Sequence, residues 1–129
     1  MMRMKKYTSW IVTVAAVLLI IGGIVWYSRL PGKYDTFASC IADSGATFFG
    51  AFWCPHCQAQ KALFGKSAQN LPYVECSTPD GQGQTQACID AGVQSYPTWE
   101  FADGSRKTGE VALSELSALT SCPLVKDSE

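Results

Sequence analysis

The chain has 129 residues, a formal net charge of −1 and a charged fraction of only 16%. A chain of this length favours a single domain, and the near-neutral charge without a basic patch excludes nucleic acid as an expected partner. Six cysteines in so short a chain indicate an oxidising compartment, provided that something exports the domain.

An uncharged apolar run, residues 10–27, predicts a membrane-spanning helix. Eighteen helical residues extend for about 27 Å, close to the roughly 30 Å of a bilayer core. Trp10 stands at one end and Trp26 with Tyr27 at the other, as interfacial anchors do. Three basic residues precede the run and two follow it: Arg3, Lys5 and Lys6, then Arg29 and Lys33. We therefore expect residues 1–9 in the cytoplasm and the domain outside, in a periplasm or lumen.

The alternative to an anchor is a cleaved signal peptide. The run is long, its far end is bulky, and it offers no small-x-small exit, so an uncleaved anchor is favoured. Residues 37–40 faintly resemble a lipoprotein cleavage box but lie ten residues beyond the run. Residues 28–35, with Pro31-Gly32, are interpreted as a linker to a domain over residues 36–122, and residues 123–129 as a tail.

The centre of this domain is a strand that ends in Cys54-Pro55-His56-Cys57 and turns into a helix. Residues 46–53 are apolar and aromatic, which suits a central strand. Pro55 fits a first helical turn, so Cys54 should lie at a helix N-terminus, where unpaired N–H groups and the helix dipole favour its thiolate. The thiolate is the form that attacks disulfides, and Cys57 lies one turn later, placed to close a small ring.

Two other interpretations of this motif are a zinc site and an inert structural disulfide. The single histidine, His56, lies inside the motif, and Cys76 and Cys88 form no second knuckle, so no metal is expected. A disulfide at a strand-to-helix turn is exposed and reactive. We interpret Cys54 and Cys57 as a redox-active pair that needs no other cofactor. Pro55 and His56 tune it, because a cation or donor beside Cys54 makes the disulfide more oxidising.

The other elements alternate helices and strands. Helices are expected at residues 36–44, 54–69 with a kink near Gly65, 84–91, and 113–121 with Leu113, Leu116 and Leu119 or Thr120 inward; strands are expected at 72–76, 98–101 and 106–108. Strand–helix–strand makes the first two strands parallel, and Asp103-Gly104 predicts an antiparallel hairpin. This α/β order resembles the thioredoxin-like fold, with the cysteines at the carboxyl end of a central strand.

A second signature is Tyr96-Pro97, immediately before the first hairpin strand. An ordinary loop proline is the simple alternative. In thioredoxin-like proteins the proline at this place is cis, faces the Cys-x-x-Cys, and has neighbours that receive the substrate as an added strand. The resemblance therefore implies that Tyr96, Pro97 and Trp53 bind substrate.

Several stretches together are similar to the thioredoxin-like domain fused to or paired with bacterial and plant vitamin K epoxide reductase homologues. They are residues 49–65, 71–76 and 95–99, with Cys88. The resemblance covers about residues 36–121 and implies that Cys54 and Cys57 take electrons from exported proteins and pass them to a quinone-linked membrane enzyme. A separate membrane anchor in place of the reductase bundle departs from that family.

Two further cysteine pairs are expected. Cys76 and Cys88 match the family's second pair and stand at a strand end and in the following helix, so they form either a structural disulfide or an electron shuttle. Cys40 and Cys122 match nothing in the family. Their pairing is inferred from parity and compartment alone.

The direction of electron flow, oxidation or reduction of the substrate, is predicted from the residue that stands six positions before Cys54. Thioredoxin-type reductases carry a buried acid six residues before the first cysteine, where this chain has Phe48. Without that base, an oxidase of exported dithiols is favoured. A membrane-tethered reductase or isomerase is the alternative within enzymes. A copper-handling module lacks its ligands, since the methionines Met1, Met2 and Met4 all precede the span. A purely structural module would not react with a small dithiol.

Overall fold

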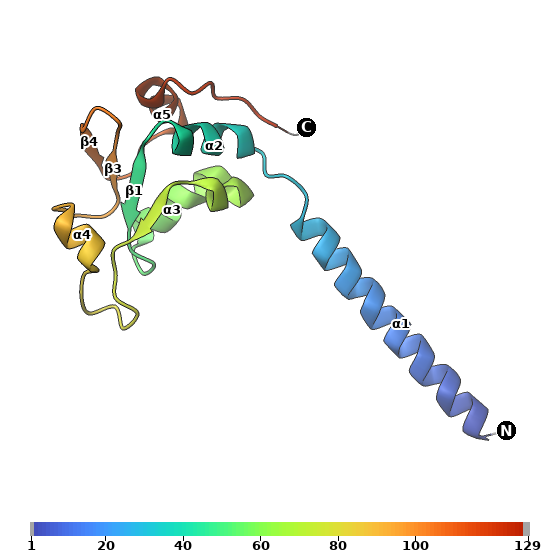
Figure 1. The fold of residues 1–129 in the computed structure, drawn as a ribbon. Helices are drawn as coiled ribbons and strands as arrows, with labels where there is room; N and C mark the ends of the chain where they lie inside the picture. The colour runs from blue at the N-terminus through green and yellow to red at the C-terminus, as the bar shows by residue number, and fades with distance from the viewer. Residues whose placement is uncertain (1, 128–129) are drawn as a thin grey trace. The chain divides into compact units, whose positions relative to one another are not determined.

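A computed structural model describes residues 2–127 of the chain (Figure 1). The chain forms two compact units that meet between Leu30 and Pro31. The first unit is a single helix, α1 (Met2–Ser28), with its large apolar side chains exposed. Its segment Tyr7–Ser28 is long and apolar enough to cross a membrane, and the predicted span of residues 10–27 lies inside it.

The second unit is built on a four-stranded mixed sheet, as predicted. The strands are β1 (Thr47–Gly50), β2 (Tyr73–Glu75), β3 (Thr98–Glu100) and β4 (Arg106–Thr108), in the order β2-β1-β3-β4. β1 pairs in parallel with β2 and antiparallel with β3, and β3 pairs antiparallel with β4. β1 is therefore central, and the cysteine motif follows its carboxyl end.

Helices flank this sheet. They are α2 (Asp35–Asp43), α3 (Pro55–Phe64), the 3₁₀ helix η1 (Gly65–Asn70), α4 (Gln86–Asp90) and α5 (Leu113–Thr120). Three predicted boundaries differ from the structure by two residues or more. The central strand ends at Gly50 rather than at residue 53, because the next residues form the turn into α3. The long helix predicted to residue 69 ends at Phe64, and the predicted kink near Gly65 is confirmed as the point where φ is 56° and the chain tightens into η1. The helix predicted from residue 84 begins at Gln86.

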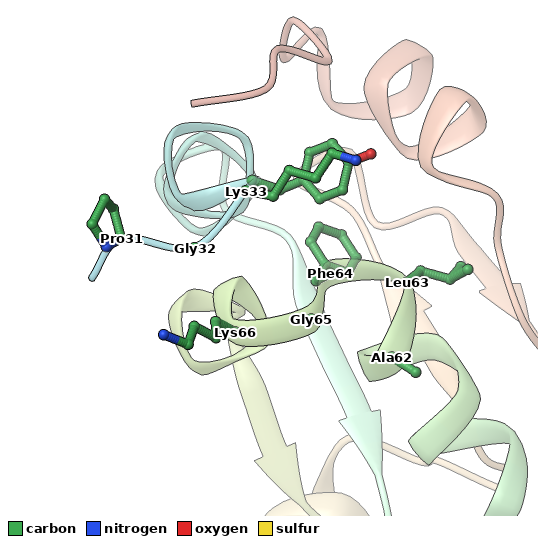
Figure 2. Close-up of a pocket in the computed structure, with 9 residues that line it drawn as sticks. Pro31, Gly32, Lys33, Ala62, Leu63, Phe64, Gly65 and Lys66 are labelled. Carbon is green, nitrogen blue, oxygen red and sulfur yellow. The ribbon is translucent and has the colours of Figure 1, made fainter. Parts of the chain in front are cut away.

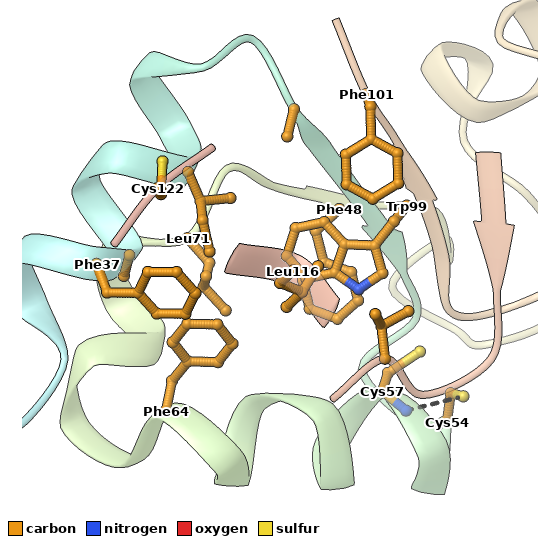
Figure 3. Packing of buried hydrophobic residues seen from close by; sticks show 14 of the residues in the cluster. Phe37, Phe48, Cys54, Cys57, Phe64, Leu71, Trp99, Phe101, Leu116 and Cys122 are labelled. Atoms are coloured by element: carbon orange, nitrogen blue, oxygen red, sulfur yellow. Dashed lines mark hydrogen bonds between the residues drawn. The ribbon is translucent and has the colours of Figure 1, made fainter. Parts of the chain in front are cut away.

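The two faces of the sheet carry two separate apolar clusters. Phe48 and Phe49 are consecutive in β1, so their side chains point to opposite faces. Phe48 belongs to the larger cluster, shown in Figure 3, where its ring stacks on Trp99 at 4.6 Å. Phe49 packs on the other face with the smaller cluster. In α5 Leu116 is fully buried in the larger cluster; of the two alternatives for the next inward residue, Leu119 is 39% exposed and Thr120 is half-buried.

Long-range contacts tie the chain ends of this unit to α2. The Cys40–Cys122 disulfide joins α2 to the second residue after α5, with a sequence separation of 82. Asp127 N–H donates to the Lys33 carbonyl at 2.8 Å, and the Thr36 N–H donates to Asp127 Oδ2 at 2.7 Å. Hydrogen bonding with the side chain and backbone of Thr36 holds the pKa of the Asp127 carboxyl below its usual range. Residues 123–127 therefore lie back against the start of α2.

Removal of the Cys40–Cys122 disulfide should destabilise the fold more than removal of the second disulfide. Closing a loop of this length is worth about 4 kcal/mol in the chain-entropy model, against about 3 kcal/mol for the Cys76–Cys88 loop. We expect Cys40→Ala/Cys122→Ala to lose more unfolding free energy than Cys76→Ala/Cys88→Ala, measured by urea unfolding of the full chain in detergent with near-UV circular dichroism. A smaller loss from the first pair would contradict the assignment of Cys40–Cys122 as the main covalent brace.

Candidate active site

Cys54 occupies the N-cap of α3. The turn that follows β1 is closed by a hydrogen bond from Cys54 N–H to the Ala51 carbonyl, at 3.0 Å. Pro55 stands at the first helical position, where its missing N–H leaves no bond unmade. The N–H of Cys57 donates to Cys54 Sγ at 3.3 Å. The local sequence thus aims a helix-terminal donor at the first sulfur, and Figure 3 shows the two cysteines at the edge of the large cluster.

Cys57 lies one turn further on and is buried, with 1% of its surface exposed. Its sulfur fits under β1 only because Gly50 has no side chain. A Cβ at Gly50 would lie 3.0 Å from Cys57 Sγ and 2.9 Å from a ring carbon of Tyr73. Burial, followed by the hydrogen bond with Cys54, raises the pKa of the Cys57 thiol to about 12. At neutral pH Cys57 is therefore a protonated thiol that needs help to become a thiolate.

The residues expected to bind substrate gather around Cys54. The Tyr96–Pro97 peptide bond is cis, and the Tyr96 carbonyl oxygen lies 3.8 Å from Cys54 Sγ. The Trp53 ring meets the Tyr96 ring edge-on at 6.1 Å and stays half exposed. Trp53 Nε1 donates to Ser77 Oγ at 2.9 Å. An exposed aromatic surface and a backbone acceptor thus border the first sulfur.

His56 makes a contact that the sequence did not predict. Its Nδ1 lies 2.8 Å from Glu110 Oε1, and the His56 side chain is 71% exposed. The segment that carries Glu110 is fixed by Gln60, a fully buried side chain of α3. Gln60 Nε2 donates to the Val111 carbonyl at 3.0 Å, and its Oε1 accepts the Val111 N–H at 2.6 Å. The carboxylate is thereby held beside the motif, and it partners the imidazole that was expected to tune Cys54.

Sequence reasoning also missed an acid that reaches the site from a neighbouring strand. Phe48, at the position where a reductase carries its acid, is fully buried. Glu75 lies opposite Gly50 in the β1–β2 register, and its Oε2 accepts the Tyr73 hydroxyl at 2.8 Å. A signal was present, because parallel pairing of the two predicted strands already placed residue 75 near the end of β1.

Cys76 and Cys88 form a disulfide in the structure. Both are fully buried in the smaller cluster with Phe49, on the face of the sheet opposite to Cys57. A sheet and a packed cluster separate this pair from solvent and from the redox cysteines. This placement favours a structural brace for the loop of residues 78–83 over an electron shuttle.

A separate pocket lies at the other end of α3, between residues 31–34 and residues 62–66 (Figure 2). The ten residues of α3 place it about 15 Å from Cys54. Gly32 is packed tightly there, since a Cβ would lie 2.3 Å from Ser67 Oγ. This pocket is therefore not part of the redox site. Within residues 2–127 no group of three or more His, Cys, Asp or Glu side chains is arranged to hold a metal ion.

A helix-capping cysteine, a buried partner one turn later and an opposing cis-proline define a thiol–disulfide exchange site on a thioredoxin-like fold. Comparison with known proteins agrees: the thioredoxin family model matches residues 33–121, so the chain belongs to the thioredoxin family. It is similar to the thiol-disulfide oxidoreductase LTO1 of Arabidopsis thaliana, 42% identical over 90 residues, 66% of this chain and 23% of that protein. It is also similar to a protein disulfide-isomerase of Aspergillus niger, 28% identical over 110 residues, 78% of this chain and 21% of that protein.

The chain thus spans less than a quarter of the length of these two relatives. The family and the relatives together give it a general thiol–disulfide redox role.

Alkylation should distinguish the roles of the two motif cysteines. We expect iodoacetamide at mildly acidic pH to label Cys54 well before Cys57 in the reduced full chain, because the pKa of Cys57 is raised and its exposed fraction, 1%, is below the 5% of Cys54. Thiol reactivity follows the thiolate fraction, which falls about tenfold for each pKa unit. Peptide mass mapping at short times measures the order. Labelling of Cys57 first would make the assignment of Cys54 as nucleophile wrong.

Proposed function

We propose that this chain is a membrane-anchored, extracytoplasmic dithiol oxidase, which oxidises cysteine pairs of exported proteins and passes the electrons to a quinone-linked vitamin K epoxide reductase homologue. The observation that carries the proposal is the surroundings of the reduced pair. Cys54 Sγ accepts a backbone N–H, while the place of the reductase acid is filled by Phe48, stacked on Trp99. The first feature stabilises the reduced protein, and the second removes a base that would promote substrate reduction.

The reaction follows from this geometry. A substrate thiolate attacks Cys54 Sγ, the Cys54–Cys57 bond breaks, and Cys57 leaves with the electron pair and takes up a proton. The second substrate thiolate then attacks the substrate sulfur of the mixed disulfide and releases Cys54. The substrate loses two electrons and the pair gains two. The half-exposed Trp53 ring and the Tyr96 carbonyl border Cys54 on the side where the substrate chain would lie.

The proposed location rests on α1 and on the disulfides. α1 contains a segment that is long and apolar enough to span a membrane. The Cys40–Cys122 and Cys76–Cys88 disulfides are typical of an oxidising compartment. Together with the small excess of positive charge before the span, these features support a cytoplasmic N-terminus and a domain in a periplasm or lumen.

An electron acceptor is needed, because the reduced cysteine pair must be reoxidised after each turnover. The identity proposed for this acceptor rests on motif resemblance. The 42% identity to a plant thiol-disulfide oxidoreductase supports a relationship to that group. A reductase or isomerase remains the second candidate, favoured by the similarity to the protein disulfide-isomerase. It would need an electron donor, and its redox pair would be more reducing.

The reduction potential separates the two candidates. We expect the full chain, equilibrated with glutathione in detergent micelles, to have a potential several tens of millivolts above the roughly −270 mV of thioredoxin. Stabilisation of the reduced form raises the potential by about 30 mV for each 1.4 kcal/mol. A value at or below that of thioredoxin would reject the oxidase direction and favour the reductase.

Trapping should identify the partners. In Cys57→Ala the mixed disulfide on Cys54 has no resolving thiol, so we expect it to accumulate with exported cysteine-containing proteins and with the membrane acceptor. Cys54→Ala/Cys57→Ala is the matched control, because it keeps both structural disulfides and lacks the nucleophile. Mass spectrometry of the captured adducts measures the result. Recovery of the same proteins with the Cys54→Ala/Cys57→Ala control would show that they are not partners of Cys54.

A further inference from the structure

Three polar residues lie on the Cys57 side of the motif and have no role in the exchange described so far. Lys61 Nζ lies 3.4 Å above the centre of the Tyr73 ring, and the Tyr73 hydroxyl donates to Glu75 Oε2 at 2.8 Å. We call these the Lys61–Tyr73–Glu75 cluster. Lys61 lies four residues after Cys57 in α3, on the same helix face, so its stem rises beside the buried sulfur. A cation, a ring and a carboxylate are thus arranged in series next to Cys57.

The carboxylate end of the cluster is fixed by the backbone of the active-site turn. Glu75 Oε1 accepts the Phe52 N–H at 3.2 Å and the Ser77 N–H at 2.9 Å. Both oxygens of Glu75 are therefore engaged, and the carboxylate is not aimed at Cys57 as a free base. It anchors the Tyr73 ring instead. Burial and the bond with Glu75 raise the pKa of Tyr73, which stays a neutral hydroxyl.

Gly50 brings this ring next to the reacting sulfur. A Cβ at Gly50 would lie within 3.0 Å of both the Tyr73 ring and Cys57 Sγ, so ring and sulfur share the space that a side chain would fill. A cation over the face of an aromatic ring is attracted by the ring electrons, and this attraction offsets part of the hydration that the cation loses there. Lys61 is thereby held close to Cys57 instead of extending into solvent.

We propose that Lys61 is the cation that stabilises the Cys57 thiolate during exchange, and that Tyr73 and Glu75 are positioning residues that hold it there. This inference rests on Cys54 and Cys57 being the redox pair of the proposed function. The acid that a reductase carries at the place of Phe48 is absent here. Instead, the Glu75 carboxylate on β2 holds the Tyr73 ring, and that ring holds Lys61 of α3.

The cluster acts when the bond between the two cysteines breaks or forms. As a substrate thiolate attacks Cys54, Cys57 departs with the electron pair, and the ammonium of Lys61 offsets the new negative charge before a proton arrives. In the reverse step Cys57 loses a proton to water and attacks Cys54 Sγ, and the substrate leaves as a thiolate. Burial is the largest influence on the pKa of Cys57 and raises it, whereas the hydrogen bond with the Ala51 backbone and, to a smaller extent, the Lys61 charge lower it.

The other titratable groups around Cys57 come from three elements. Cys54 precedes it at the cap of α3, and its influence raises the pKa of Cys57. Tyr73 and Glu75 come from β2 and are bonded to each other. His56 is paired with Glu110 on the exposed side of the motif. The positive charge of Lys61 lowers the pKa of Cys57, whereas burial raises it.

A stepwise reaction with a chromogenic nitrobenzoate disulfide tests this inference on the reduced full chain in detergent. The first coloured thiolate is released when Cys54 attacks the reagent, at a rate proportional to reagent concentration. The second is released when Cys57 closes the ring, at a rate independent of that concentration. The other four cysteines are in disulfides and do not contribute. The second phase therefore reports on Cys57 alone.

We expect Lys61→Met to slow the second phase at neutral pH by roughly threefold for each unit that the pKa of Cys57 rises, since nucleophilicity partly compensates for lost thiolate. The pH midpoint of that phase should move upward, and the first phase should not change. Lys61→Arg should restore both, and Tyr73→Phe, which keeps the ring but loses the bond to Glu75, should fall between. Lys66→Met, at the separate pocket of Figure 2, is the matched control and should match wild type.

The outcomes separate this inference from the proposed function. A second phase with unchanged rate and pH midpoint in both Lys61→Met and Lys61→Gln, beside a normal wild-type second phase, overturns the role of Lys61 alone. Failure of the wild type to release a second equivalent overturns the redox pair itself, and the inference with it. Because Cys57 is protonated in the resting reduced form, the potential that tests the oxidase direction is expected to change little in these variants.

Discussion

The site depends on one close approach, that of the Cys57 sulfur to the backbone of Gly50. A side chain at this point of the central strand would meet both Cys57 Sγ and the Tyr73 ring. Its absence lets α3 begin directly against β1, so that Cys54 caps the helix while Cys57 lies beneath it. The two sulfurs are chemically alike and both are buried, but Cys54 Sγ accepts a backbone N–H while burial raises the pKa of Cys57, which divides their roles.

The sheet separates the redox cysteines from the Cys76–Cys88 disulfide, whereas Cys122 of the other disulfide belongs to the same cluster as Cys57. Phe48 and Phe49 point to opposite faces of β1. Cys54 and Cys57 lie in the cluster of Phe48, and Cys76 and Cys88 lie in the cluster of Phe49. Cys57 belongs to the larger cluster, whereas Cys76 and Cys88 are bonded in the smaller one. A disulfide with no exposed surface, across a sheet from the motif, is well placed to hold the loop beside Trp53 and poorly placed to exchange electrons with Cys54.

Much of this could be predicted from sequence because the signals are local. A strand followed by Cys-Pro-His-Cys places a thiol at a helix start, and Asp103-Gly104 specifies a hairpin. The failures have equally physical causes. The apolar character of residues 51–53 continues that of the strand, although they form a turn, so hydrophobicity alone placed the strand end too late. Helical spacing from Leu116 left Leu119 and Thr120 as alternatives for the inner face, and the structure turns Thr120 inward while Leu119 stays exposed.

The contacts missed at the site all join residues far apart in the chain or on different elements. His56 meets Glu110, Gln60 fixes Val111, and Glu75 reaches the active-site turn from the next strand. The first two contacts have no spacing that a pattern could reveal, whereas the place of Glu75 follows from the parallel pairing of the two predicted strands. The sequence shows that Phe48 stands where a reductase carries its acid. This one position does not show that Glu75, on the neighbouring strand, reaches the same site. In a parallel pair, the residue opposite Gly50 enters the same space from β2, so the electrostatics of a buried thiol belong to the strand pair rather than to the motif.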